Sequence, residues 1–429
     1  MLELYRQLED YIMKDIAMRL LESGEMSGTA DRLIWKLQQM GEHKSVIMKR
    51  LAQLTGLTTT ELKALLQEAV LTSWEDDVNV YDAIGVTVSN PLKNPTVISV
   101  VNAEYQKSLT ELQNLTRTTM EKSQKDLINM MDEAEIRVAS GVQSYSAVVC
   151  DILDRYAGQG IKVTYPTGTE RTLEAAVRMC VVTSMNQTAA QVTNQYIVET
   201  KTNYVLTSAH IGARVKHDGQ PDLAGHDLWQ GRVFCIQGSE QDIPNLLDST
   251  GYDIDPVTGQ GKVVDPLGLH GYNCRHGHKP WDKSLRNPWR DKDGNLLDGK
   301  GDLITSERNR KYYELQQKQR SYERSIRKTK RELLVKQQEI DGIAETDIKS
   351  ILQQDYDKLA SKLQKQNKAY NDFCEQNNLQ KQYDRIKVSG FNRSQAATVT
   401  QAAKRQKGVG TWSQTEYNKR QNIKWRVQS

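Results

Sequence analysis

Histidine is the most unevenly distributed residue type in the sequence, and imidazole can bind metals or transfer protons. Six of the seven histidines lie between His210 and His278. They fall into two groups, from Ser208 to His226 and from Gly268 to His278. Any chemistry in this chain is therefore expected within this segment.

The first possibility is a metal site. Cys274 and His276 would supply one half of a tetrahedral zinc-type set, and two of His210, His217 and His226 the other half. The spacing argues against it, because Cys-x-His is tighter than the usual ligand pairs, which have about two to four residues between them. We therefore predict no metal and no cofactor, with Cys274, His276 and His210 as the residues to consider if a metal is bound.

The second possibility is a nucleophilic Cys274 that a neighbouring imidazole activates, although no partner acid or oxyanion loop is recognisable. The third is structural. Buried His, Asn, Arg and Trp side chains would hydrogen-bond the backbone of a loop-rich core, and small residues would let its segments pass closely. We prefer this third interpretation. The small residues concerned are Gly212, Ala213, Gly231 and Gly271.

The composition suggests exposed helices rather than one deep core. The chain has 429 residues, of which 38% are hydrophobic, with a formal net charge of +4, and its mean hydropathy is −0.66. Its length predicts two to three domains. Five scattered cysteines are typical of reduced thiols. The N-terminus does not resemble a signal peptide, and no apolar run is long enough to cross a membrane.

The segments on either side of the histidines have helical periodicity. Residues 1–75 predict four short helices, with Gly41 and Gly56 as stops. Such helices could form a DNA-reading helix-turn-helix, but a docking role is preferred because no helix face is dominated by Lys or Arg. A long helix is expected after residues 76–100, and strands at Tyr204–Leu206 and Arg232–Ile236.

The last third of the chain is basic. From Arg308 to Lys336 there are eleven Lys or Arg and three Glu. From Phe391 onward Glu416 is the only acidic residue, and Trp412, Tyr417 and Trp425 lie among basic residues, which suits docking or stacking on bases. The residues that could contact DNA phosphates are Arg324, Arg327, Lys328, Lys330, Arg331, Lys404 and Arg405.

Together these patterns predict an α+β fold with a helical N-terminal region, a central mixed α/β loop-rich domain, long C-terminal helices and a mobile tail. The expected regions are a docking region at 1–100, a connecting helix at 101–159, the central domain at 160–300, a basic helical region at 301–390 and a basic tail at 391–429.

Several long motifs in this order resemble the phage minor capsid protein 2 family, which looks related to phage Mu F-like head morphogenesis proteins. They are TLEAAVRMCVVTSMNQTAA (172–190), SAHIGAR (208–214), WQGRVF (229–234), GLHGYNCRH (268–276), Pro280-Trp281, YELQQKQRSYERSIRKTKRE (313–332) and NKAYNDFCEQNNL (367–379). Ile211 and Val215 depart from the family, which tends to have proline there. The segment between Arg214 and Trp229, which holds His217 and His226, is longer than the resemblance predicts, which weakens any metal site that needs these two residues.

The resemblance implies a low-copy structural protein, present in the host cytoplasm during assembly and then in the virion, in the head interior or at the portal vertex. Its expected partners are the portal protein, the major capsid or scaffold protein, and double-stranded DNA bound without sequence specificity through phosphates, but no membrane. It also implies structural roles for the signature residues His210, Gly212, Arg214, Trp229, Gly231, Gly271, Asn273, Cys274, Arg275 and His276.

Two other classes of function stay open at this point. One is an enzyme or toxin, such as an ADP-ribosyltransferase-like or metal-dependent activity in residues 200–281, although no pair of catalytic glutamates or phosphate-cradling loop is recognisable. The other is a DNA-binding regulator that acts through the N-terminal helices. We favour the structural protein and predict no enzymatic activity.

Overall fold

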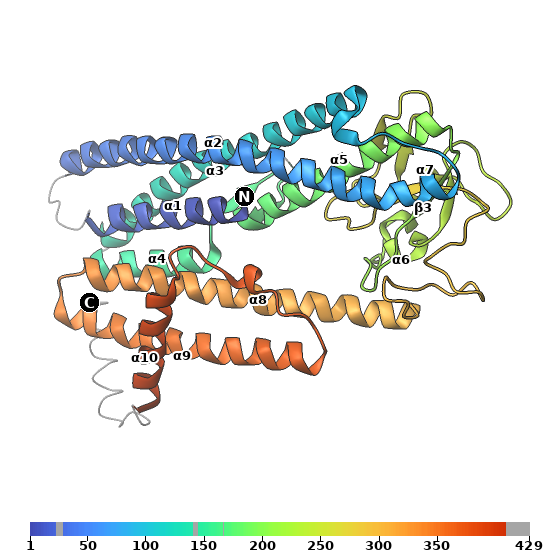
Figure 1. Cartoon of the computed structure of the whole chain (residues 1–429). Coiled ribbons are helices and arrows are strands. Elements are labelled where there is room, and N and C mark those ends of the chain that lie inside the picture. Colours follow the sequence, from blue (N-terminus) through green and yellow to red (C-terminus); the bar gives the residue numbers. More distant parts are fainter. Residues whose placement is uncertain (23–28, 140–144, 166, 409–429) are drawn as a thin grey trace. The chain divides into compact units, whose positions relative to one another are not determined.

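The computed structural model describes residues 1–22, 29–139, 145–165 and 167–408 (Figure 1). The described chain is mainly helical with small antiparallel sheets, which confirms the α+β class. Within it, no helix is long and apolar enough to cross a bilayer. The α-helices are α1 (Leu2–Glu22), α2 (Thr29–Ala83), α3 (Pro95–Ala139), α4 (Tyr145–Gln159), α5 (Leu173–Thr200), α6 (His226–Trp229), α7 (Leu246–Thr250), α8 (Ser306–Gly342), α9 (Thr346–Gln376) and α10 (Arg393–Gly408).

In the described part of the chain, the strands are short and pair into three sheets. β1 pairs with β2, β3 lies between β4 and β7, and β5 pairs with β6. They are β1 (Lys162–Thr164), β2 (Glu170–Thr172), β3 (Tyr204–Thr207), β4 (Val233–Cys235), β5 (Tyr252–Ile254), β6 (Gly261–Val263) and β7 (His278–Trp281). The 3₁₀ helices of the described residues are η2 (Pro91–Lys93), η3 (Asp222–Ala224) and η4 (Tyr383–Ile386).

The chain divides into two compact units, and each gathers segments that are distant in sequence. Unit 1 consists of residues 1–56, 114–176 and 319–429, and unit 2 of residues 57–113 and 177–318. This division differs from the five consecutive regions expected from the sequence. Its boundaries fall inside α2, α3, α5 and α8, so no proline-rich or glycine-rich linker marks them.

The first of the four expected N-terminal helices is present as α1, but the stops at Gly41 and Gly56 were wrong, because α2 is one continuous helix through both glycines. A glycine inside a helix costs about 1 kcal/mol relative to alanine, and packing along the helix outweighs that cost here. The buried apolar residues of α2 that provide this packing are Ile47, Leu51, Leu62, Leu66, Val70, Val80 and Tyr81. The helix-turn-helix alternative loses its basis, since the turns that it needs are absent from the described part of α2.

In unit 1, a buried polar cluster joins α1 to α2. Arg19 Nε donates to Asp15 Oδ2 at 2.7 Å, and its guanidinium also contacts Gln39 and Glu42. His43 Nδ1 lies 2.5 Å from the same Asp15 oxygen. These contacts satisfy charges that would be costly to bury without partners.

A second buried charge in unit 1 connects segments from its three parts. Glu174, at the start of α5, accepts from Arg6 of α1 at 3.2 Å and from Arg327 of α8 at 2.9 Å. Arg6 also donates to the carbonyl of Asp384 at 2.5 Å. The carboxylate has two cationic partners, and the close packing of this unit depends on keeping both.

The C-terminal region of unit 1 is more ordered than expected. α9 runs beside α8, and α10 crosses α9 (Figure 1). Val399, Ala402 and Ala403 of α10 are buried, so the expected mobile tail begins with a packed helix. The rest of the expected tail, with Trp412, Tyr417 and Trp425, lies outside the described residues.

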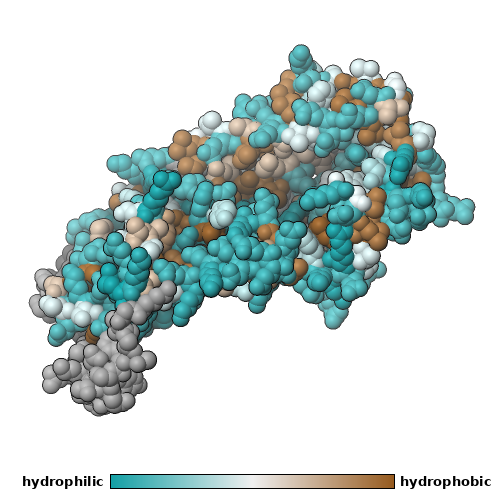
Figure 2. Space-filling model, turned by 60° about the horizontal axis from the view of Figure 1, so that its bottom comes forward, coloured by the Kyte–Doolittle hydropathy of each residue, from teal (hydrophilic) through white to brown (hydrophobic). Residues whose placement is uncertain are grey.

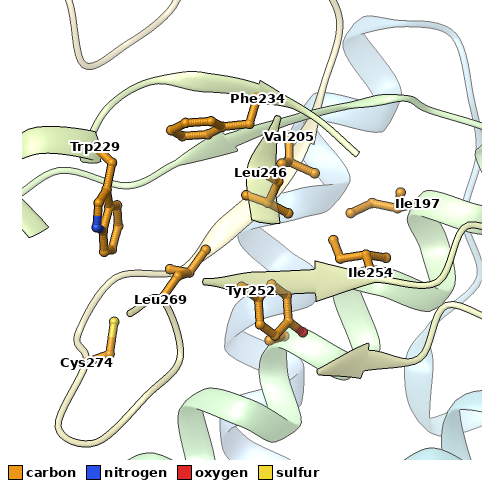
Figure 3. Packing of buried hydrophobic residues seen from close by; sticks show 10 residues of the cluster. Ile197, Val205, Trp229, Phe234, Leu246, Tyr252, Ile254, Leu269 and Cys274 are labelled. Carbon is orange, nitrogen blue, oxygen red and sulfur yellow. The ribbon is translucent and has the colours of Figure 1, made fainter. Parts of the chain in front are cut away.

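Unit 2 contains the core that surrounds the histidines. The apolar side chains of this core point inward from α5, β3, β4, β5 and the loops around them (Figure 3). The expected strands are confirmed, and residues 251–265 form the β5–β6 hairpin. The members of this core are Ala190, Ile197, Val205, Trp229, Phe234, Leu246, Tyr252, Ile254, Leu269 and Cys274.

A neighbouring cluster in unit 2 packs α2, α3 and α5 together through Val70, Tyr81, Val97 and Tyr196. Beside it, Thr193 Oγ1 donates to Asp77 Oδ2 at 2.5 Å. Burial raises the pKa of the Asp77 carboxyl to about 7, although the bond from Thr193 lowers it. The folded chain therefore holds the proton more tightly than the unfolded chain, in which this pKa is about 4.

The first prediction concerns the pH dependence of Asp77. Stability from its protonated form is fully present below about pH 4 and is lost as the pH rises through about 7. Asp77→Asn removes this loss, because an amide does not ionise. The free energy of unfolding of Asp77→Asn minus that of the wild type should be larger at about pH 8 than at about pH 5, by on the order of 2 kcal/mol. Urea unfolding at both pH values measures this, and Asp82→Asn, an exposed position of the same helix, serves as the control. An equal difference for Asp77→Asn at both pH values would contradict the prediction.

Candidate functional site

The histidines of unit 2 are placed by short elements and the loops between them. The chain leaves β3 toward His210, α6 begins at His226, and β7 begins at His278. His270 and His276 lie in the loop between β6 and β7. All of these are buried or half-buried, whereas His217 is exposed.

Three of the candidate ligands converge in the first cluster. His226 Nδ1 lies 3.2 Å from His276 Nδ1, and Cys274 Sγ lies 3.9 Å from each of these nitrogens. The three ligand atoms lie within 4.8 Å of one another, and all three residues are buried. In the sequence, His226 is a weak candidate ligand because it lies in a segment longer than the family pattern, whereas the structure brings it into the cluster. His210, which was named instead, stacks on the His276 ring with centroids 4.3 Å apart.

The other ring nitrogens of this cluster meet oxygen atoms. His226 Nε2 lies 2.8 Å from the carbonyl oxygen of Leu267, and His276 Nε2 lies 3.2 Å from Gln230 Oε1. The backbone N–H of His210 donates to the same Gln230 oxygen at 3.0 Å. Both rings are therefore held in fixed orientations.

The second cluster is a chain of hydrogen bonds that leads from the β6–β7 loop to α5. His270 Nε2 lies 2.7 Å from His278 Nδ1, and His278 Nε2 lies 2.8 Å from Asn194 Oδ1. Asn194 Nδ2 donates to the Tyr252 hydroxyl at 2.9 Å, and His270 Nδ1 contacts Asn186 Oδ1. Side chains of α5 thus orient the loop.

Burial determines the charge states at this site. It lowers the pKa of His276 and His270 well below the usual range, and that of His226 and His278 to about 3. These rings are therefore neutral at neutral pH. Burial also raises the pKa of the Cys274 thiol to about 11, and the residue is 1% exposed. An activated nucleophile needs a lowered pKa and access to substrate, so the nucleophile interpretation loses its basis.

The signature glycines lie where a side chain would collide. A Cβ on Gly212 would lie 2.7 Å from the Tyr312 ring, and one on Gly231 would lie 2.5 Å from a Leu296 methyl. Both have positive φ, 77° and 64°. At both positions the chain segments therefore pass too closely to admit a side chain.

The other signature residues divide between core and surface. Trp229 Nε1 donates to the Leu223 carbonyl at 2.9 Å, and Arg214 donates to the carbonyls of Leu267 and Tyr272. Asn273 and Arg275, which were expected to hold the core, are exposed. The backbone of Asn273 has a φ of 56°. Asparagine tolerates this left-handed conformation, so the turn, rather than a buried side chain, explains why asparagine suits this position.

Sequence reasoning missed the polar residues that hold the loops. Asn309 accepts from the backbone N–H groups of Gly212 at 2.8 Å and Ala213 at 2.9 Å, and donates to the Ala213 carbonyl. Gln191 bonds both the N–H and the carbonyl of Gly261. Both lie on helices, where an Asn or Gln gives no sequence signal that separates it from surface residues.

Several of the residues that were expected to contact DNA instead bond other residues of unit 1. Arg327 bonds Glu174, Lys330 donates to the Ile386 carbonyl, and Arg331 donates to the Ala157 carbonyl. Lys328 and Arg405 pair with carboxylates but stay about half exposed, with 52% and 50% of their side chains accessible. Arg324 and Lys404 are exposed.

Comparison with known proteins defines the class to which this fold and site belong. The family described as Phage minor capsid protein 2 matches residues 1–375. The chain therefore belongs to the phage minor capsid protein 2 family, and it is a structural protein of the phage virion. Neither curated proteins nor solved structures give a match.

The second prediction tests how tightly the β6–β7 loop is packed. A Cβ on Gly271 would lie 2.2 Å from the Pro266 carbonyl oxygen, and the backbone there cannot move aside easily. Gly271→Ala should lower the free energy of unfolding by at least about 2 kcal/mol. Gly277→Ala, in the same loop with nothing within 4 Å of the new Cβ, should change it little. Thermal unfolding measures the stability of both variants. Equal stability of Gly271→Ala and Gly277→Ala would contradict the prediction.

Proposed function

We propose that this chain is a low-copy protein of the phage head that lies at the portal vertex or in the head interior. It binds the portal protein or the major capsid or scaffold protein, and it acts in head morphogenesis or DNA ejection. The observation that carries the proposal is the family match over residues 1–375. The buried histidine centre of unit 2 supports an architectural role, because His226, Cys274 and His276 are each at most 2% exposed.

The surface also suits contacts with other head proteins. On the face shown in Figure 2, hydrophilic residues predominate and hydrophobic residues form smaller areas among them. Single apolar side chains stand out on each unit, such as Ile136 in unit 1 at 71% exposure and Val257 in unit 2 at 81%. Interfaces that form after folding are of this mixed kind, with bulk composition close to that of the remaining surface.

Contact with packaged DNA is part of the proposal for the exposed cations of unit 1. Arg324, Lys328, Lys404 and Arg405 have the required charge and exposure. Such contact would be with phosphates, so it would be independent of sequence and sensitive to salt.

The third prediction concerns copy number and place. Purified virions should contain a few copies of the chain per particle, all at one vertex, because portal-associated proteins follow the unique portal site. Quantitative mass spectrometry of particles gives the number, and asymmetric cryo-electron microscopy gives the position. A uniform distribution over the shell, or absence from virions, would rule the proposal out.

The fourth prediction concerns DNA. The full chain should bind double-stranded DNA of unrelated sequences equally, with affinity that falls as salt rises from about 50 to 200 mM. Arg324→Gln combined with Lys404→Gln should weaken binding several-fold and reduce the salt slope by about 1 per lost contact. Fluorescence anisotropy measures both quantities. The control is Lys216→Gln, which replaces an exposed lysine of unit 2. If Lys216→Gln weakens DNA binding as much as the double variant does, Arg324 and Lys404 do not form a specific DNA contact.

A further inference from the structure

The first histidine cluster has a hydrogen-bonding problem. A backbone carbonyl only accepts, so the Leu267 oxygen at 2.8 Å requires a proton on Nε2 of His226. A neutral imidazole carries one N–H, so Nδ1 of His226 presents a lone pair. This lone pair points toward Nδ1 of His276, 3.2 Å away.

His276 is held in the same tautomer. Its Nε2 faces Gln230 Oε1, which already accepts from the backbone N–H of His210. Turning the Gln230 amide would place its NH₂ group against that N–H, two donors facing each other. The oxygen therefore stays where it is, Nε2 of His276 donates to it, and Nδ1 of His276 also presents a lone pair.

Two buried lone pairs thus face each other, with a sulfur beside them. Cys274 Sγ lies 3.9 Å from both nitrogens, and its single proton can satisfy only one of them. A cation between the three atoms would satisfy all of them at once. From these contacts we propose that His226, Cys274 and His276 bind one zinc ion through Nδ1, Sγ and Nδ1.

The distances agree with this assignment. With Zn–N of about 2.05 Å and Zn–S of about 2.3 Å, a tetrahedral ion holds two nitrogens about 3.3 Å apart and a sulfur about 3.6 Å from each. The nitrogen pair, at 3.2 Å, already has this spacing. The sulfur, at 3.9 Å, needs to approach by a few tenths of an ångström, which a small rotation of the Cys274 side chain provides.

The donor set and its surroundings favour zinc over a hard cation. One thiolate and two imidazoles suit zinc, whereas magnesium and calcium prefer oxygen ligands. Both imidazoles donate their remaining N–H to an oxygen, the arrangement that orients metal-binding histidines. Trp229 packs against both rings, with centroids 4.6 Å from His226 and 4.8 Å from His276.

Binding displaces the thiol proton of Cys274 to solvent and forms a sulfur–zinc bond. The ion would add a metal bridge between α6 and the β6–β7 loop, which already share the hydrogen bond from His226 to the Leu267 carbonyl. A tetrahedral ion has one further position, which water or the His210 imidazole can fill. Nε2 of His210 is buried and has no hydrogen-bond partner within the described chain. The site is independent of where the chain lies in the phage head.

The fifth prediction is metal content. The purified full chain, incubated with equimolar zinc and dialysed, should hold about one zinc per chain by mass spectrometry of the metal. Cobalt in its place should give the thiolate-to-metal absorption of a cysteine ligand. Cys274→Ser and His226→Gln should each lower the zinc content at least about tenfold. His217→Gln and Cys235→Ser, outside the cluster but in the same unit, should leave it unchanged.

A measurement on the unaltered chain covers the case in which the variants fail to fold. Removal of zinc with a chelator should lower the midpoint of thermal unfolding, and zinc but not magnesium should restore it. The proposal is overturned if the wild type holds less than about 0.1 zinc per chain after incubation. Retention of zinc by soluble Cys274→Ser and His226→Gln would overturn it as well.

Discussion

Unit 2 depends on one constraint, which is that the buried backbone groups of its loops need hydrogen-bond partners away from water. Side chains of the helices supply them. Asn309 of α8 holds the turn at Gly212, Gln191 of α5 holds both polar groups of Gly261, and Asn186 donates to the His276 carbonyl. A loop that would be mobile on its own is therefore fixed by the helices, and the histidine rings are fixed with it.

The sequence predicts what is encoded locally and misses what is created by folding. The strands at Tyr204–Leu206 and Arg232–Ile236 follow from short patterns, and both are present. The convergence of His226 on Cys274 does not, because 48 residues separate them. Spacing rules for metal ligands describe ligands that are close in sequence, so they give little weight to a cluster assembled from α6 and a distant loop.

Charge was the other source of error. The basic stretch of α8 has the pattern of a solvated helix face, yet Lys336 is buried and bonds Glu339 and Asp154, and Arg327 meets Glu174. Asp154 and Glu174 come from other helices, so their presence cannot be read from α8 alone. Buried pairs of this kind leave an uncompensated charge when one member is lost, which makes these positions part of the packing of unit 1.

The interleaving of segments affects how the chain is made. The contact between Arg6 and the Asp384 carbonyl joins residues 378 positions apart, so it forms only after the segment around Asp384 has been translated. Unit 2 is assembled from residues 57–113 and 177–318, so it also waits for a late segment. Shortened translation products would leave apolar helix faces uncovered and be open to proteolysis. Translation of the late segments and acquisition of structure are thereby coupled, so a chain that stops before them completes neither unit.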